Sequence, residues 1–166
     1  MLITLTGMPG SGKTTVGRIV ADALGCPFMD LDTLIEKKAG KSIPDIFAAE
    51  GEAGFRLLEG KMLKQTVAKY AQSDAVLALG GGTVTLPGAP ALLQEKTLCI
   101  YLKASLETLA PRLQNTGDRP LLAAPGDLER ILAEREPLYE TAAHVTLDTD
   151  GASPETLADE IIISVL

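Results

Sequence analysis

The chain has 166 residues, a formal net charge of −7 and 46% hydrophobic residues. This length favours one domain with a sizeable core, and the acidic balance argues against a nucleic-acid-binding protein, which would present a basic face. No apolar run approaches the roughly 20 residues that span a bilayer, and a strand is expected from residue 2, so we expect no membrane segment and no secretory signal. Cys26 and Cys99 lie in apolar surroundings and are expected to be reduced thiols, which favours a cytoplasmic protein.

Short apolar stretches alternate with longer amphipathic stretches along the chain. The pattern predicts strands at 2–6, 27–30, 76–79, 98–102 and 144–148. It predicts helices at 13–24, 32–39, 43–49, 52–71, 88–94, 105–114, 127–142 and 154–165. Strands that alternate with helices indicate an α/β fold with a parallel sheet covered on both faces. The turn-rich segment 114–126 has no predicted element and is too long for a routine connection.

A phosphate-binding loop joins the first predicted strand to the first predicted helix. Residues 7–14 read Gly-Met-Pro-Gly-Ser-Gly-Lys-Thr, which matches the pattern Gly-x-x-x-x-Gly-Lys-Thr. Backbone N–H groups of such a loop turn around a polyphosphate, and the helix start adds a partial positive charge. Lys13 is placed to reach the β- and γ-phosphates, and the Thr14 hydroxyl to bind Mg²⁺. A chance match of a glycine-rich turn has a prior of only about 1%, so we interpret the loop as a nucleotide site.

Polar residues also follow the second and third predicted strands, where ligands of a parallel sheet bind. Asp30 and Asp32 are expected on the same side by strand alternation. One could hold Mg²⁺ through water while the other binds or deprotonates an acceptor hydroxyl, although capping of the next helix is the structural alternative for Asp32. The run Gly80-Gly81-Gly82 favours a loop that faces a ligand over a simple tight turn.

Three arginines are candidates for binding anionic groups. Arg56 and Glu59 share a helix face and can pair, either to present a fork to a carboxylate or as an exposed ion pair worth about 0–1 kcal/mol. The residues alone leave these two readings even. Arg119 lies in the segment without a predicted element, where a lid would carry it onto a transferring phosphate and exclude water. Arg135 lies on the following predicted helix, and a solvated surface position is the alternative for both.

In this order the motifs resemble those of the shikimate kinase family, small P-loop kinases with a nucleoside-monophosphate-kinase-like fold. Besides the phosphate loop, the resemblance rests on Asp30-x-Asp32, Ser42-Ile43-x-x-Ile46-Phe47, Gly51-Glu52-x-x-Phe55-Arg56-x-x-Glu59, Leu79-Gly80-Gly81-Gly82, Arg119-Pro120-Leu121-Leu122 and Arg135-x-Pro137-Leu138-Tyr139. It covers nearly the whole chain. It implies three α/β/α layers with a five-stranded parallel sheet in the order 2-3-1-4-5. It further implies one domain over 1–166, with a substrate-binding region at 32–70 and a mobile lid at 112–125.

The resemblance implies ATP-dependent phosphorylation of the 3-hydroxyl of shikimate to 3-phosphoshikimate and ADP, in the pathway to chorismate and the aromatic amino acids. It implies ATP and Mg²⁺ as cofactors, and a monomer that binds neither nucleic acid nor membrane. Lys13, Asp32 and Arg119 would be catalytic, with Asp32 as the base. The residues that would bind ATP are Gly10, Ser11, Gly12, Lys13, Thr14, Thr15, Arg112, which would stack on adenine, and Arg119. Those that would bind shikimate are Asp32, Arg56, Gly80, Gly81, Gly82 and Arg135, with the two arginines on its carboxylate. Mg²⁺ would be held by Thr14 and, through water, by Asp30.

Two other functions stay open on the sequence. A gluconate-type sugar-acid kinase shares the fold, but it is not expected to combine Gly-Glu-x-x-Phe-Arg with Arg-x-Pro-Leu-Tyr. A non-catalytic ATP-binding regulatory module is the alternative from another class. A module that only binds ATP needs no second site for an anion. The candidate anion-binding residues Arg56, Arg119 and Arg135 therefore argue against this alternative.

Overall fold

The computed structural model describes residues 1–113, 124 and 126–166. Its centre is one five-stranded sheet with the strand order β2-β3-β1-β4-β5, in which all neighbouring strands are parallel. The strands are β1 (Leu2–Thr6), β2 (Phe28–Asp30), β3 (Ala75–Ala78), β4 (Leu98–Lys103) and β5 (Val145–Asp148). The expected fold class and strand order are confirmed, and the first strand occupies the middle of the sheet.

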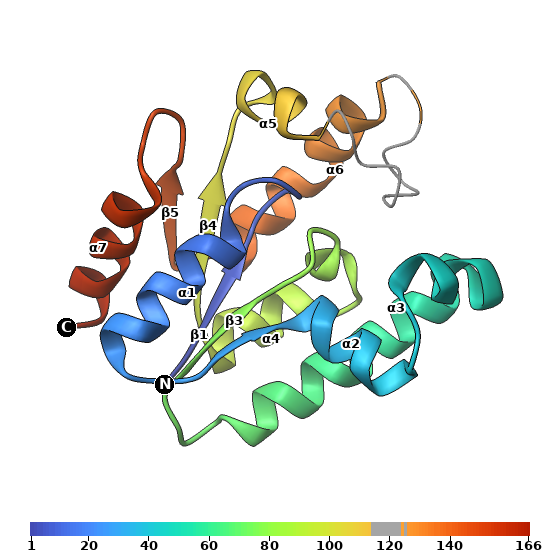
Figure 1. The fold of residues 1–166 in the computed structure, drawn as a ribbon, viewed down its shortest axis with the longest axis horizontal. Coiled ribbons are helices and arrows are strands. Elements are labelled where there is room, and N and C mark those ends of the chain that lie inside the picture. The colour runs from blue at the N-terminus through green and yellow to red at the C-terminus, as the bar shows by residue number, and fades with distance from the viewer. Residues whose placement is uncertain (114–123, 125) are drawn as a thin grey trace.

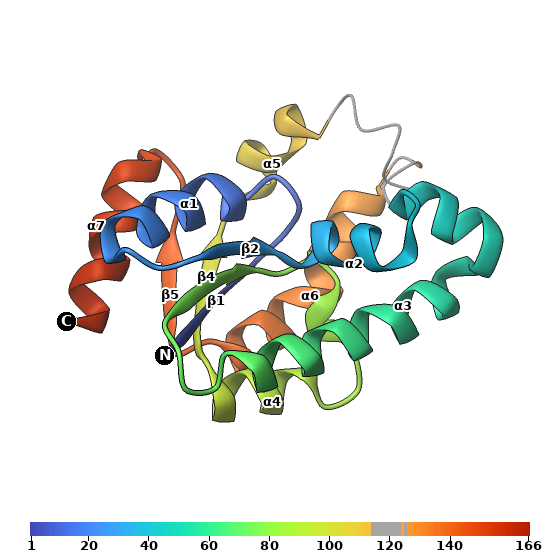
Figure 2. The same cartoon turned by 60° about the horizontal axis from the view of Figure 1, so that its bottom comes forward.

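Helices cover both faces of this sheet, so the architecture has three layers (Figures 1 and 2). One face carries α1 (Lys13–Leu24) and α7 (Pro154–Val165), which pack against each other. The other face carries α3 (Ile43–Lys69), α4 (Ala89–Lys96) and α6 (Asp127–Ala142), with α2 (Leu31–Ala39) packed on α3. The remaining described elements are α5 (Leu106–Arg112) and the short 3₁₀ helix η1 (Thr83–Thr85).

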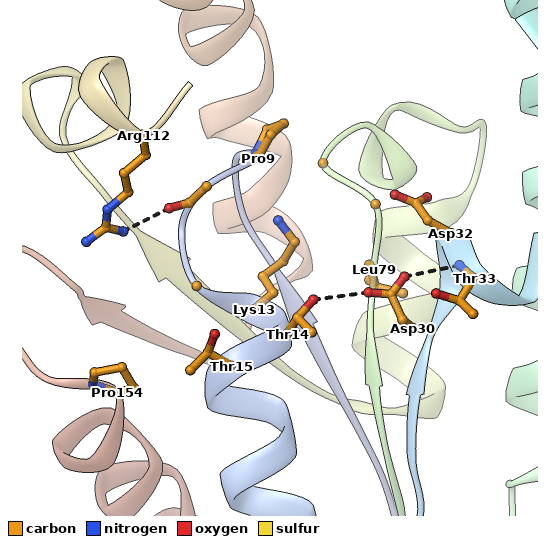
Figure 3. Close-up of a pocket in the computed structure, with 14 residues that line it drawn as sticks. Pro9, Lys13, Thr14, Thr15, Asp30, Asp32, Thr33, Leu79, Arg112 and Pro154 are labelled. Carbon is orange, nitrogen blue, oxygen red and sulfur yellow. Dashed lines mark hydrogen bonds between the residues drawn. The ribbon is translucent and has the colours of Figure 1, made fainter. Parts of the chain in front are cut away.

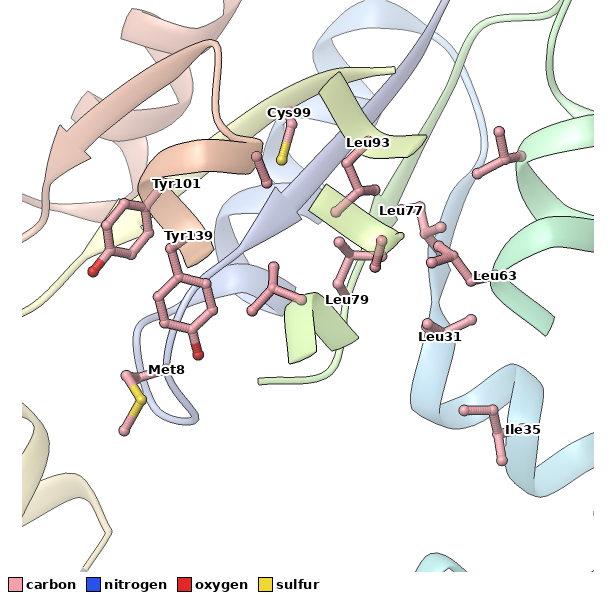
Figure 4. Close-up of a cluster of buried hydrophobic side chains, with 14 of the residues drawn as sticks. Met8, Leu31, Ile35, Leu63, Leu77, Leu79, Leu93, Cys99, Tyr101 and Tyr139 are labelled. Carbon is pink, nitrogen blue, oxygen red and sulfur yellow. The ribbon is translucent and has the colours of Figure 1, made fainter. Parts of the chain in front are cut away.

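Each face of the sheet has its own hydrophobic core because successive strand residues point to opposite sides. In β1, Ile3 and Leu5 enter the core beneath α1 and α7, whereas Leu2 enters the larger core beneath α3, α4 and α6. The larger core extends to the phosphate loop, where Met8 is buried in the same cluster as Tyr101 and Tyr139 (Figure 4). The two cores therefore support the carboxyl ends of the strands, and the candidate functional site lies at these ends.

Several element bounds differ from the prediction by one or two residues, and three differences concern helices near the site. The helices predicted at 43–49 and 52–71 are two parts of α3, which is kinked at Gly51, where the backbone (φ 71, ψ −177) is not helical. The second helix α2 begins at Leu31 rather than residue 32, directly after the strand. The helix η1 was not predicted, because three residues are too few to show a helical period.

Within the described parts of the chain, no helix is both long and apolar enough to cross a membrane.

Candidate active site

The carboxyl ends of β1, β2 and β3 surround a cavity of about 580 Å³. Most of the residues predicted to form the nucleotide and metal sites line it (Figure 3). The lining residues are Pro9, Gly10, Gly12, Lys13, Thr14, Thr15, Asp30, Asp32, Thr33, Leu79, Gly80, Gly81, Arg112 and Pro154. The fold thus brings together the phosphate loop, the two aspartates and the glycine run, as the strand-end rule predicts.

The phosphate loop ends at the start of α1, which lacks a side-chain cap. Gly12 is the N-cap residue in a left-handed conformation, so the N–H groups of the first helical turn remain available at the cavity. The Lys13 ammonium lies along the inside of the loop and donates to the carbonyls of Gly7 (2.8 Å) and Met8 (2.9 Å). Ser11 does not line the cavity; its side chain is buried at 2% exposure. The arrangement provides the amide donors and the cation that a polyphosphate needs.

Asp30 connects the phosphate loop to the second strand. Its carboxylate accepts a hydrogen bond from the Thr14 hydroxyl at 3.1 Å and one from the Thr33 N–H at 3.3 Å. Asp30 is therefore the residue that caps α2, and the capping alternative considered for Asp32 is wrong. Asp32 lies in the first turn of α2. Both aspartates line the cavity, but through this strand-to-helix junction and not through the strand alternation that we expected.

The pair of Thr14 and Asp30 fits a hard divalent cation. Hydroxyl and carboxylate oxygens are ligands that Mg²⁺ accepts, and this ion usually keeps several water molecules and phosphate oxygens in its shell. Among the described residues, no cluster of three or more His, Cys, Asp or Glu side chains is arranged to hold a metal. A cation at Thr14 and Asp30 would therefore take its other ligands from water and from a bound phosphate.

Arg56 is held by a buried carboxylate. Glu59 has 1% exposure and accepts hydrogen bonds from the Arg56 guanidinium (2.6 Å) and from the Thr83 hydroxyl (2.8 Å). The Arg56 side chain is itself only 17% exposed. Glu52 lies farther away, at 3.7 Å from the guanidinium, and is 54% exposed. The exposed ion pair considered as an alternative for Arg56 and Glu59 is therefore wrong.

The run Gly80–Gly82 lets several side chains approach its backbone closely. A Cβ atom at Gly80 would lie 2.9 Å from an Asp32 carboxylate oxygen. One at Gly81 would lie 2.7 Å from the Pro9 ring and 3.2 Å from the Arg135 guanidinium. One at Gly82 would overlap the guanidinium of Arg56. Absence of side chains here allows an acid and two arginines to converge beside the phosphate loop.

Arg135 and Tyr139 reach this loop from α6. The Arg135 side chain is buried at 7% exposure, so the surface position considered for it is wrong. Tyr139 lies one helical turn later, and its hydroxyl donates to the Gly81 carbonyl at 2.5 Å. Sequence reasoning assigned no role to Tyr139. Its signals in the sequence were its place in the motif Arg135-x-Pro137-Leu138-Tyr139 and its spacing of four residues from Arg135, which puts both on one face of a helix.

Two further predicted site residues come from the segment that the resemblance predicts to be a lid. Arg112 ends α5, is exposed, lines the cavity and donates to the Gly10 carbonyl at 2.8 Å. Arg119 lies outside the described residues, and its role in binding phosphate stays a prediction.

Comparisons with known proteins agree with this geometry. A family model described as shikimate kinase matches residues 9–166. The shikimate kinase of Symbiobacterium thermophilum is 44% identical over 98% of this chain and 94% of its own length. That of Mycobacterium avium is 41% identical over 95% of this chain and 89% of its own. Among solved structures, the shikimate kinase from Acinetobacter baumannii in complex with shikimate is 37% identical, with a TM-score of 0.92 over 99% of this chain and 92% of that one.

Proposed function

This chain belongs to the shikimate kinase family, and from that premise we infer that it transfers the γ-phosphoryl group of ATP to the 3-hydroxyl of shikimate, giving 3-phosphoshikimate and ADP. One observation carries the inference: Asp32, Arg56 and Arg135 converge on the Gly80–Gly82 backbone beside the phosphate loop. A polyphosphate site next to an acid and two arginines suits an acceptor that has both a hydroxyl and a carboxylate.

We propose that the phosphate loop holds the donor. The first-turn N–H groups of α1 and the Lys13 ammonium bind the phosphates and stabilise the charge that develops on the transferring group. Thr14 would hold Mg²⁺ directly, and Asp30 would do so through water. The ion, when bound, neutralises charge on the β- and γ-phosphate oxygens. Arg112 lies at the open side of the loop, and its stacking on adenine stays a prediction.

We propose that Arg56 and Arg135 hold the shikimate carboxylate while Asp32 faces the 3-hydroxyl. The Asp32 carboxylate accepts the hydroxyl proton as the oxygen attacks the γ-phosphorus, and the bond to the β,γ-bridging oxygen breaks to release ADP. Gly80–Gly82 let the substrate lie against the backbone. On this proposal residues 32–70 form the substrate-binding region of one domain, 112–125 its lid with Arg119, and the protein acts as a cytoplasmic monomer.

The test measures ADP release with shikimate or gluconate as acceptor, with and without Mg²⁺. We expect ADP to form only when shikimate and Mg²⁺ are both present. The Lys13→Ala variant should bind shikimate and show the unfolding transition of the wild type. It should nevertheless lose turnover, because the cation at the transferring phosphate is gone. Release of ADP with gluconate but not with shikimate as acceptor would assign the chain to the gluconate-type kinases. Binding of ATP without turnover of either acceptor would favour a regulatory module.

A further inference from the structure

Tyr139 has no part in the reaction as proposed, yet it touches the loop on which the acceptor groups converge. Its side chain is fully buried in α6 and packs on Tyr101, with ring centroids 4.9 Å apart. Burial raises the pKa of the Tyr139 phenol to about 12, although the positive charges of Arg135 and Arg56 act in the opposite direction. The hydroxyl therefore keeps its proton at neutral pH and acts as a donor to the Gly81 carbonyl.

The three carbonyl groups of Gly80–Gly82 are held in different ways. The first accepts a hydrogen bond from the Thr83 N–H at 3.2 Å. The third accepts hydrogen bonds from the N–H (3.0 Å) and the hydroxyl (2.6 Å) of Thr85. Both of these contacts are local. The middle carbonyl, that of Gly81, is instead held by Tyr139, 58 residues away in the chain.

The glycine loop is thus attached to two helices, and each of these helices carries one arginine of the site. On one side, Glu59 of α3 binds the hydroxyl of the residue after the loop and also the guanidinium of Arg56. On the other side, Tyr139 of α6 binds Gly81, next to which lies the guanidinium of Arg135. The loop therefore serves as a spacer between the two arginines.

We propose that Tyr139 is a positioning residue: by fixing α6 to the Gly81 carbonyl, it sets the place of Arg135 relative to Arg56. This inference rests on the proposed function, because it assumes that both arginines grip one carboxylate. A carboxylate held by two separate guanidinium groups needs both at bonding distance at once, so a small displacement of α6 weakens the grip.

The first experiment compares the steady-state kinetics of Tyr139→Phe with those of the wild type. The shikimate carboxylate is remote from the reacting hydroxyl and keeps its charge during transfer. Arg56 and Arg135 therefore bind it equally well in the bound substrate and in the transition state. We expect KM for shikimate to rise roughly tenfold, with kcat and KM for ATP each within about twofold of wild type. A purely structural role would lower kcat through loss of folded enzyme and leave KM for shikimate unchanged.

Tyr101→Phe is the matched control. It removes the other hydroxyl of the same ring pair, which points away from that of Tyr139 (Figure 4). We expect wild-type kinetics from this variant. Equal KM values for shikimate in Tyr139→Phe and in an active wild type would overturn the positioning role while leaving the proposed function intact. An inactive wild type would instead contradict the proposed function.

A second measurement needs no variant of Tyr139 to fold. The chain has three tyrosines, so protein labelled with 3-fluorotyrosine gives three ¹⁹F signals, which Tyr101→Phe and Tyr70→Phe assign. We expect the Tyr139 signal to shift as shikimate saturates the site, and the Tyr70 signal to stay in place. A Tyr139 signal that does not move at saturating shikimate would contradict the inference.

Discussion

At the scale of single residues, Glu59 is the most buried charged group in the described site. Its carboxylate has 1% exposure and is bound by Arg56 and by the Thr83 hydroxyl. Burial of a carboxylate is costly unless its oxygens are satisfied, and here each oxygen has a donor. The spacing of three residues predicted the pair with Arg56. It could not predict the burial, because Thr83 comes from a distant part of the chain.

We expect Glu59→Gln to lower the free energy of unfolding by about 2–4 kcal/mol, because an amide leaves the Arg56 charge without a matching partner and turns an N–H toward a donor. Urea unfolding with a constant slope measures this change. Glu52→Gln is the control, since Glu52 lies 3.7 Å from Arg56 and is 54% exposed, and it should change stability by less than about 0.5 kcal/mol. Equal losses in the two variants would mean that burial of Glu59 has no energetic weight.

At the scale of elements, α3 shows what a single glycine does to a helix. Gly51 has φ 71 and ψ −177, a backbone conformation that residues with a side chain avoid. It separates the two helices predicted at 43–49 and 52–71. The break was predictable because Gly51 interrupts the pattern. The cap at Asp30 was not, because Asp30 and Asp32 are equally good capping residues and only the real end of β2 decides between them.

The same substitution should have opposite effects at two places in α3. Gly51→Ala forces a side chain into a strained conformation and should destabilise the protein by about 1–3 kcal/mol. Gly60→Ala lies in a regular part of the helix, where the new Cβ would meet only Leu86 at 4.0 Å, and should stabilise it by about 1 kcal/mol. Thermal unfolding of the two variants measures both changes. Destabilisation by Gly60→Ala would contradict the open space beside Gly60, where the nearest atom is that of Leu86.

At the scale of the whole molecule, several groups in the larger core stay protonated to a higher pH in the folded chain than in the unfolded chain. Burial raises the pKa of Cys99 from 9.0 to about 11 and that of Tyr139 from 10.0 to about 12. It also raises the pKa of Tyr101, helped by Glu136. In the unfolded chain these groups ionise near their ordinary values, so alkaline solution favours unfolding.

We expect stability to be full below about pH 9 and to fall as the pH rises toward 11, at about 1.4 kcal/mol per pKa unit of each group. Urea unfolding at a series of pH values measures the slope. Cys99→Ala loses some packing at every pH, but its slope between pH 9 and 10 should be flatter than that of the wild type. Identical slopes would contradict the raised pKa of Cys99.

The sequence and the structure agree most where local pattern decides the outcome. Hydrophobic period placed the strands and most helices, and the strand-end rule gathered the phosphate loop, Asp30, Asp32 and the glycine run into one site. The order of the strands came from family resemblance, since alternation of strands and helices is compatible with several orders. The approach of Arg56 and Arg135 to one loop depends on the packing of α3 and α6, which no local pattern records.

The central place of β1 has a consequence for synthesis on the ribosome. Its neighbours are β3 and β4, so neither edge of this first-made strand can pair until residues 75–78 and 98–103 have been translated. Until both neighbours have been translated, the nascent chain carries an apolar strand with at least one open edge, which is a template for aggregation. The nucleotide loop that follows β1 cannot take its final shape before the same point. The nascent chain therefore carries its nucleotide-binding motif well before β4 has emerged, but it gains a usable site only after that point.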